Sequence, residues 1–95
     1  MRKITADAIR AFRNRQPFKR GNTKVEVFDD SVVLFLHGNI IAEYRADGAL
    51  YIQDGGWQSN TTKERLNGLP NVNITQKDFV WYLNGEAWSG GWTLI

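Results

Sequence analysis

The side chains that most often carry chemistry are few in this sequence and stand far apart. His37 is the only histidine and there is no cysteine, so a cluster of the usual zinc ligands cannot form. His37 directly precedes Gly38 at the expected end of a strand. We interpret it there as an imidazole that hydrogen-bonds locally, with use as a general base as the alternative. We therefore expect no metal site.

Carboxylate pairs are the next candidates, because neighbouring acids can exchange protons or bind Mg²⁺. The adjacent pair Asp29-Asp30 sits between two expected strands, and aspartates at turns hydrogen-bond their own backbone. We interpret this pair as a turn. The acids that follow have no spacing that matches an ion-binding loop: Glu43, Asp47 and Asp54.

Nucleotide and nucleophile motifs do not appear either. The pairs Gly55-Gly56 and Gly90-Gly91 lack the Lys-Ser/Thr ending and the following helix of a phosphate-binding loop. The serines in turn contexts have no elbow motif and no matching His-Asp pair: Ser31, Ser59 and Ser89. We expect no catalytic residue, no cofactor and no enzymatic activity; a small hydrolase or nuclease with an unfamiliar site is a further alternative.

The uneven distribution of charge has a direct physical use. Residues 1 to 20 hold seven cations against one anion, Asp7, which gives +6. The rest of the chain holds five cations against nine acids, which gives −4 and accounts for the net charge of +2. A cationic arm can neutralise phosphates and release counterions, so its binding weakens with salt. The expected nucleic-acid contacts are Arg10, Arg13, Arg15, Lys19 and Arg20.

Twelve aromatic residues in 95 are more than one small core hides easily. Exposed rings would stack on single-stranded bases, and the candidates are Trp57, Tyr82, Trp88 and Trp92. A patch of Trp57, Trp88 and Trp92 would instead suit a protein partner, which an acidic surface would attract to the basic arm. A third interpretation is a solvated basic face beside an aromatic core.

The first of the elements that position these residues is a basic helix. We expect it over 6–14, with Thr5 as the N-cap and with Arg10 and Arg13 one turn apart on the same face. Pro17 ends the helical pattern. Residues 17–22 are predicted as a positively charged loop, and residues 1–20 together form a basic helix and arm.

Short β-branched and aromatic runs separated by turn dipeptides predict antiparallel hairpins. We expect four strands, over 24–28, 32–37, 40–45 and 49–53, with Gly38-Asn39 and Asp47-Gly48 among the turns. A second helix is expected over 62–68, capped by Thr61 and Glu64, with Lys63 and Arg65 toward solvent. A final hairpin joins 71–75 to 79–83 and ends at Asn84-Gly85.

These elements predict one α+β domain over 1–95, with a mainly antiparallel sheet of about six strands. The lack of cysteine fits a reducing compartment. Arg2 and Lys3 are not followed by the apolar run of a signal peptide, and no stretch reaches the length of a membrane span. We expect a soluble, cytoplasmic protein.

Three segments resemble small proteins encoded by tailed bacteriophages and prophages: Phe35 to Ala42 (FLHGNIIA), Thr61 to Asn67 (TTKERLN) and Gln76 to Leu83 (QKDFVWYL). The likeness covers roughly residues 18 to 88. It implies an accessory protein in an infected bacterial cytoplasm and carries over no activity and no site. In that setting a protein partner would be a host machine, such as a defence system, and a minor structural role in the virion is a further alternative.

Overall fold

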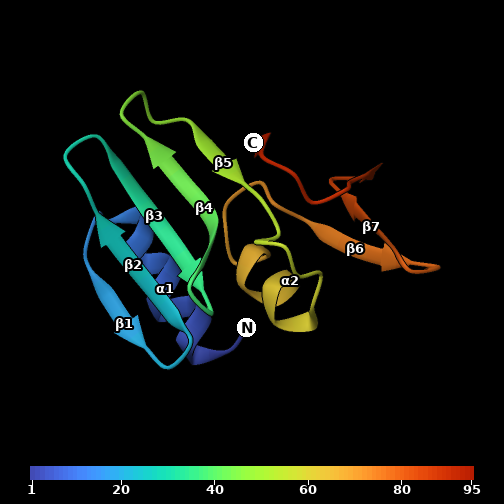
Figure 1. Ribbon diagram of the computed structural model, residues 1–95, viewed down its shortest axis with the longest axis horizontal. Helices are drawn as coiled ribbons and strands as arrows, with labels where there is room; N and C mark the ends of the chain where they lie inside the picture. Colours follow the sequence, from blue (N-terminus) through green and yellow to red (C-terminus); the bar gives the residue numbers. More distant parts are fainter.

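A six-stranded antiparallel sheet forms the largest element of the computed structural model, which describes residues 1–95 (Figure 1). Its order is β1-β2-β3-β4-β5-β9. The expected α+β class and the antiparallel sheet of about six strands are confirmed. The strands are β1 (Phe18–Arg20), β2 (Thr23–Val27), β3 (Ser31–Leu36), β4 (Asn39–Arg45), β5 (Leu50–Ile52) and β9 (Thr93–Leu94).

The hairpin turns of this sheet lie close to the turn dipeptides of the sequence. Asp29-Asp30 lies in the turn between β2 and β3, as expected. The Phe28 N–H closes this turn by donating to the Ser31 carbonyl. The next turn falls one residue earlier than predicted: His37 and Gly38 form it with φ of 52° and 78°, and Leu36 pairs with Asn39. Positive φ at both central residues is what a tight hairpin turn requires.

β1 corrects the expectation of a loop over 17–22. Phe18 pairs with Val25 and Arg20 with Thr23, so this segment extends the sheet beyond β2. The sequence pattern was too short and too charged to indicate a strand. Two features hold it in place: the Phe18 ring packs against the core, and Gly21 turns the chain with φ of 56°.

Helix α1 (Lys3–Arg13) covers one face of the sheet and begins earlier than predicted. Ala8, Ile9 and Phe12 are buried against the strands, as its apolar stripe required. Thr5 is not the N-cap. It lies inside the helix, fully buried, and its hydroxyl donates to the Glu64 carboxylate.

Helix α2 (Asn60–Leu66) is capped by Ser59, whose hydroxyl accepts from the Thr62 N–H at 3.1 Å, so Thr61 is not the cap. Arg65 was expected in solvent, but its side chain is only 2% exposed. It donates to the hydroxyls of Thr5 at 2.8 Å and Thr23 at 3.1 Å. Polar partners on α1 and β2 therefore draw this guanidinium into the interior.

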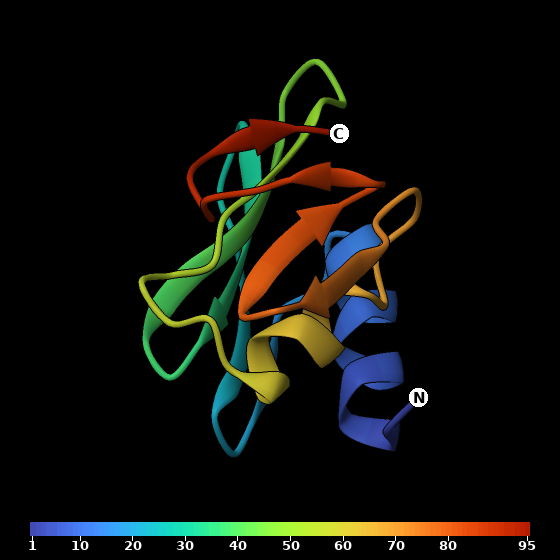
Figure 2. The ribbon, with the colours of Figure 1, turned by 90° about the vertical axis from the view of Figure 1, so that its right-hand side faces the viewer.

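A second, three-stranded sheet follows α2: β6 (Ile74–Lys77), β7 (Val80–Leu83) and β8 (Glu86–Ala87). The predicted hairpin is confirmed with later limits, and Asn84-Gly85 is the turn between β7 and β8. Figure 2 shows this sheet and both helices on the same side of the larger sheet, and nineteen buried residues form one core. Neither helix combines the length and the apolar character needed to cross a bilayer.

Candidate nucleic-acid interface

Cations of α1 and β1 gather around one carboxylate. Asp7 Oδ1 lies 2.8 Å from Arg10 Nη2, and Asp7 Oδ2 lies 2.8 Å from Arg20 Nη1. Lys3 Nζ is 3.5 Å from the same carboxylate. Asp7 therefore places a helical arginine and a strand arginine side by side, although they are ten positions apart in sequence.

The electrostatics of Asp7 reflect this cluster. A hydrogen bond from Arg20 holds the pKa of the Asp7 carboxyl below its ordinary value of 3.8, and the nearby charge of Lys3 lowers it further against the opposing effect of burial. Asp7 is therefore ionised at neutral pH. Its single charge offsets only part of the charge of the three cations that surround it.

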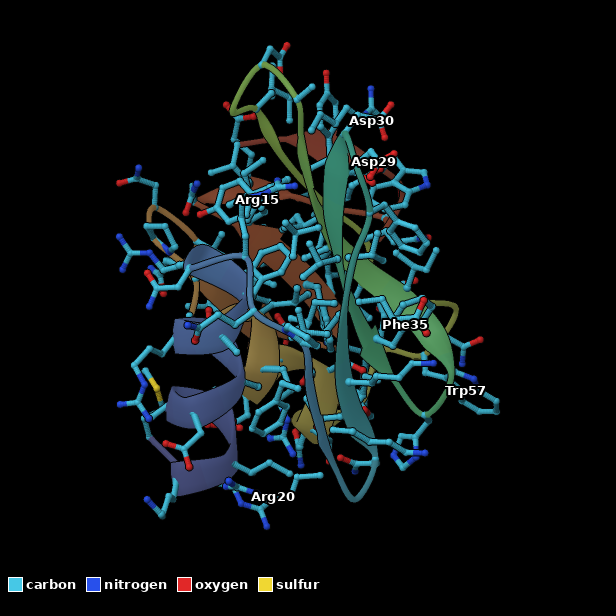
Figure 3. All side chains as sticks on the ribbon, turned by 90° about the vertical axis from the view of Figure 1, so that its left-hand side faces the viewer. Arg15, Arg20, Asp29, Asp30, Phe35 and Trp57 are labelled. Atoms are coloured by element: carbon cyan, nitrogen blue, oxygen red, sulfur yellow. The ribbon has the colours of Figure 1, made fainter.

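The other expected contacts lie around the same elements. Arg15 donates to the Phe28 carbonyl at 3.0 Å, beyond the C-terminal end of α1, while Arg20 lies near its N-terminal end (Figure 3). Arg13 and Lys19 are exposed and make no ion pair. Together with the three cations around Asp7, these residues form what we call the basic surface: Lys3, Arg10, Arg13, Arg15, Lys19 and Arg20.

Lys24 continues the positive charge onto the adjacent strand, where Lys19 pairs with it in the ladder. Its ammonium lies 4.6 Å from the centre of the Phe35 ring and 2.7 Å from Glu26 Oε1. Phe35 lies on the face of the sheet that is turned away from α1 (Figure 3). This pair joins the basic surface to an aromatic ring on that face.

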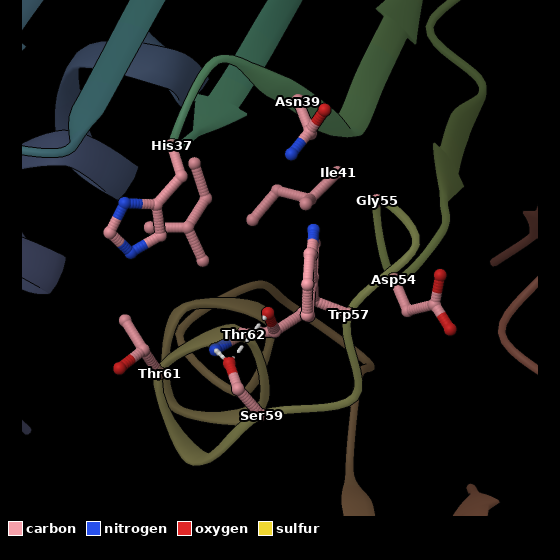
Figure 4. A pocket seen from close by; sticks show the side chains of 10 residues that line it. His37, Asn39, Ile41, Asp54, Gly55, Trp57, Ser59, Thr61 and Thr62 are labelled. Carbon is pink, nitrogen blue, oxygen red and sulfur yellow. Dashed lines mark hydrogen bonds between the residues drawn. The ribbon is translucent and has the colours of Figure 1, made fainter.

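A cleft of about 420 Å³ opens between the β3–β4 turn, the loop after β5 and the start of α2. We call it the His37–Trp57 cleft, and its principal lining residues are His37, Asn39, Ile41, Trp57, Ser59 and Thr61. Figure 4 shows the Trp57 indole edge-on, with one face toward the side of the cleft where His37 lies. The Asp54 carboxylate, also at the rim, points away from that space.

The polar groups of the cleft are only partly used within the chain. Ser59 Oγ is 3.1 Å from Thr62 Oγ1, and His37 Nε2 is 3.3 Å from Asn22 Nδ2. His37 is thus hydrogen-bonded within the chain, to a residue of the β1–β2 turn that lies 15 positions away in sequence. In Figure 4 the Asn39 amide nitrogen points toward Ile41 without a dashed partner, whereas the Thr61 hydroxyl points away from Trp57. An aromatic wall, an apolar floor and these polar groups can together hold a flat, polar-edged molecule.

The aromatic residues proposed from the sequence do not form one patch. Trp88 is buried: its ring stacks on Trp81 with centroids 6.3 Å apart, and its Nε1 donates to Thr93 Oγ1 at 2.9 Å. Trp88 is therefore a core residue, because packing satisfies its rings and the hydrogen bond to Thr93 satisfies its N–H. Trp57 is 69% exposed and lines the cleft, whereas Trp92 is half-exposed and Tyr82 half-buried, and neither lines it.

Sequence reasoning did not bring His37, Asn39 and Trp57 together. These residues meet because the loop after β5 lies tightly on the β3–β4 hairpin. A Cβ added at Gly55 would stand 3.1 Å from Ile41 Cγ2 and 3.2 Å from Asn39 Cβ, and Gly55 has φ of 69°. The Gly55-Gly56 pair was the available signal, since a glycine marks close backbone approach as well as a turn.

Residues 1–93 match the family described as Kyanoviridae Gp96 protein, which is nearly the whole chain. The resemblance to small phage-encoded proteins is thereby confirmed. No curated protein matches the chain, and no solved structure does so either.

Proposed function

This chain belongs to the Kyanoviridae Gp96 protein family, a family of phage proteins, and on that premise we propose that it is a non-enzymatic accessory protein that binds nucleic acid. The basic surface makes the phosphate contacts, and the site of action is the cytoplasm of the infected bacterium. The relevant interaction is electrostatic, with the backbone of the nucleic acid as its target.

The observation that carries this proposal is the arrangement around Asp7. One anion holds Arg10 and Arg20 at 2.8 Å each, so cations from a helix and a strand share one face. Seven cations against one anion leave residues 1 to 20 with a charge of +6. A charge so concentrated on adjoining elements attracts a polyanion from a distance and then contacts several of its phosphates.

The dimensions of the surface suit such a ligand. Helix α1 has 11 residues and is therefore about 16 Å long. One strand of B-form DNA advances about 3.4 Å per phosphate, so this length corresponds to roughly five phosphates. Arg20 and Arg15, near opposite ends of α1, mark the extent of the contact (Figure 3).

The test is fluorescence-anisotropy titration of labelled DNA and RNA, single- and double-stranded, at roughly 50 and 200 mM salt. Two charge reversals provide a matched comparison. Lys19→Glu changes an exposed lysine of β1 within the basic surface, whereas Lys77→Glu changes an exposed lysine of β6 outside it. Both variants change the net charge equally.

We expect binding that weakens steeply with salt, and a larger loss of affinity in Lys19→Glu than in Lys77→Glu. Equal losses in the two variants would point to net charge alone rather than to this surface. No binding of any nucleic acid at low salt would overturn the proposal.

A second candidate function, binding to a host protein, is favoured by Phe79. This residue forms the β6–β7 turn with Asp78, and its side chain is 93% exposed with φ of 68°. A bulky residue in the left-handed region is strained, and such strain persists where the residue serves a contact. An aromatic ring at the tip of a hairpin is also a common anchor at protein interfaces.

The salt dependence of binding and the position of the disruptive substitution distinguish the two functions. Capture of a host protein that persists at high salt, is lost in Phe79→Gly and is retained in Lys19→Glu would support the protein-binding function. Capture that depends on Lys19 and disappears with salt would instead reflect the basic surface.

A further inference from the structure

We propose that the His37–Trp57 cleft binds one unpaired nucleobase, so that the ligand of the basic surface is single-stranded nucleic acid. This inference rests on the proposed function and names its substrate class. It adds a second set of contacts, made to a base, to those made to the backbone.

The stacking surface is Trp57. Its ring is 69% exposed, and in Figure 4 one face is turned toward the side of the cleft where His37 lies. A base placed there would cover this face and rest on the buried side chain of Ile41. The volume of about 420 Å³ falls within the range of small-ligand sites, roughly 300–1,000 Å³.

The edge of the base would meet the Asn39 amide, whose nitrogen points toward Ile41 without a partner in Figure 4. The Asn39 amide offers one acceptor and a donor group side by side, which matches the alternating donors and acceptors along a base edge. The Asp54 carboxylate points away from this space, so no anion opposes an electron-rich ring there.

The cleft is preformed by the backbone around it. In the β3–β4 ladder Leu34 pairs with Ala42 and Phe35 pairs with Ile40, so Ile41 is an extra, bulged residue. A bulge redirects its side chain, and here the side chain of Ile41 lines the cleft. Gly55 packs closely on Ile41, with φ of 69° and only 3.1 Å between an added Cβ and Ile41 Cγ2, and this contact positions the loop that carries Trp57.

The cleft is continuous with the positive charge. His37 also lines a neighbouring hollow of about 300 Å³, together with Lys19, Lys24 and Phe35. A strand with one base beside Trp57 would therefore place adjacent phosphates near these two lysines. A duplex cannot bind in this way, because its bases remain stacked and paired inside the helix.

The experiment compares Trp57→Ala with Trp92→Ala, which removes a half-exposed tryptophan outside the cleft. The probes are a labelled single-stranded oligonucleotide, a duplex of the same length and an abasic oligonucleotide with the same number of phosphates. We expect Trp57→Ala to weaken single-strand binding roughly 5- to 150-fold, the range for loss of one stacked base. Trp92→Ala should not change it, and Trp57→Phe should retain most of the affinity.

The abasic oligonucleotide should bind the wild-type protein as weakly as the intact single strand binds Trp57→Ala. Equal binding of the intact and abasic strands, with Lys19→Glu still defective, would overturn this inference and leave the proposed function intact. Loss of binding to every probe at low salt would overturn both. A mononucleotide that binds as tightly as the oligonucleotide would make a free nucleotide the ligand and also contradict the single-strand proposal.

Discussion

Arg65 and Glu64 are consecutive residues of α2, yet Arg65 Nη1 and Glu64 Oε1 lie 2.6 Å apart. Consecutive helical residues ordinarily point to different sides. The pair forms here because both side chains turn toward Thr5 of α1, whose hydroxyl accepts from Arg65 and donates to Glu64. A buried guanidinium with a partial counter-charge thereby links the two helices.

Removal of the counter-charge should destabilise the fold. Glu64→Ala would leave the Arg65 guanidinium buried without its carboxylate partner, so we expect a loss of about 2–4 kcal/mol in the free energy of unfolding. The exposed Glu86 provides the control, and Glu86→Ala should change it by less than about 0.5 kcal/mol. Urea unfolding measures both. Similar values for the two variants would contradict a structural role for the pair.

The same carboxylate predicts sensitivity to acid. Burial acts to raise the pKa of Glu64, but hydrogen bonds from the Thr5 hydroxyl, the Arg2 amide and the Arg65 guanidinium outweigh it, and the pKa lies below its ordinary value of 4.5. The folded state therefore binds this proton less readily than the unfolded chain. The stabilisation is complete above pH 4.5 and is lost as the pH falls through the lower folded value.

Urea unfolding from roughly pH 7 to pH 3 tests this expectation. Stability should decline below pH 4.5 in the wild-type protein, and the decline should be shallower in Glu64→Gln, which cannot titrate there. Asp7, whose pKa is also lowered, adds a decline that begins near its ordinary value of 3.8. Identical pH profiles for the two proteins would refute the assignment to Glu64.

A side chain at Gly68 should destabilise the fold, because the turn that follows α2 approaches α1 closely at this point. An added Cβ would lie 2.9 Å from Thr5 Cγ2 and 3.0 Å from Ile9 Cγ1. We expect Gly68→Ala to lower the free energy of unfolding by about 1–3 kcal/mol through overpacking. Gly91→Ala, with no atom within 4 Å of its added Cβ, should be nearly neutral; a neutral Gly68→Ala would show that the helices can separate without cost.

Phe79→Gly should stabilise the protein. The phenylalanine has φ of 68° and contributes little burial, so its replacement relieves backbone strain and sacrifices few contacts. We expect a gain of about 1 kcal/mol in the free energy of unfolding, measured by thermal or urea denaturation. A destabilised variant would mean that the ring packs on the hairpin after all.

Asp7→Asn should strengthen the proposed binding of nucleic acid. The amide retains one oxygen acceptor, enough for one of the two arginines that now bind separate carboxylate oxygens, and removes the one negative charge among them. We expect affinity at low salt to rise a few-fold and the salt dependence to steepen by up to about 0.9 in the logarithmic slope, the value for one added phosphate contact. Asp78→Asn removes an equal charge at the β6–β7 turn and should have a much smaller effect.

Local signals predicted most of the hairpins, because a turn such as Asn84-Gly85 depends on a few adjacent residues. Long-range partners decided what was missed. Thr5 was predicted to be the helix N-cap because its actual partner, Glu64, lies 59 positions away in sequence. Arg65 was expected in solvent because nothing near it in sequence indicates that Thr5 and Thr23 would satisfy its donors.

The candidate site shows the same division. The cations of the basic surface were evident from composition, but the His37–Trp57 cleft depends on packing between residues about 15 to 20 positions apart. Trp57 and Trp88 are alike as residue types, and only the tertiary structure separates an exposed ring from a buried one. Aromatic content therefore predicted that some rings would be available but not which.

β1 forms one outer edge of the larger sheet, and such an edge can recruit strands from other molecules and begin aggregation. It has only three residues, and two of them are the cations Lys19 and Arg20. Repulsion between like charges would keep a second copy from pairing there. The charge that we propose for phosphate contact thus also protects the protein in its free state, and variants that neutralise both residues should become less soluble as they lose binding.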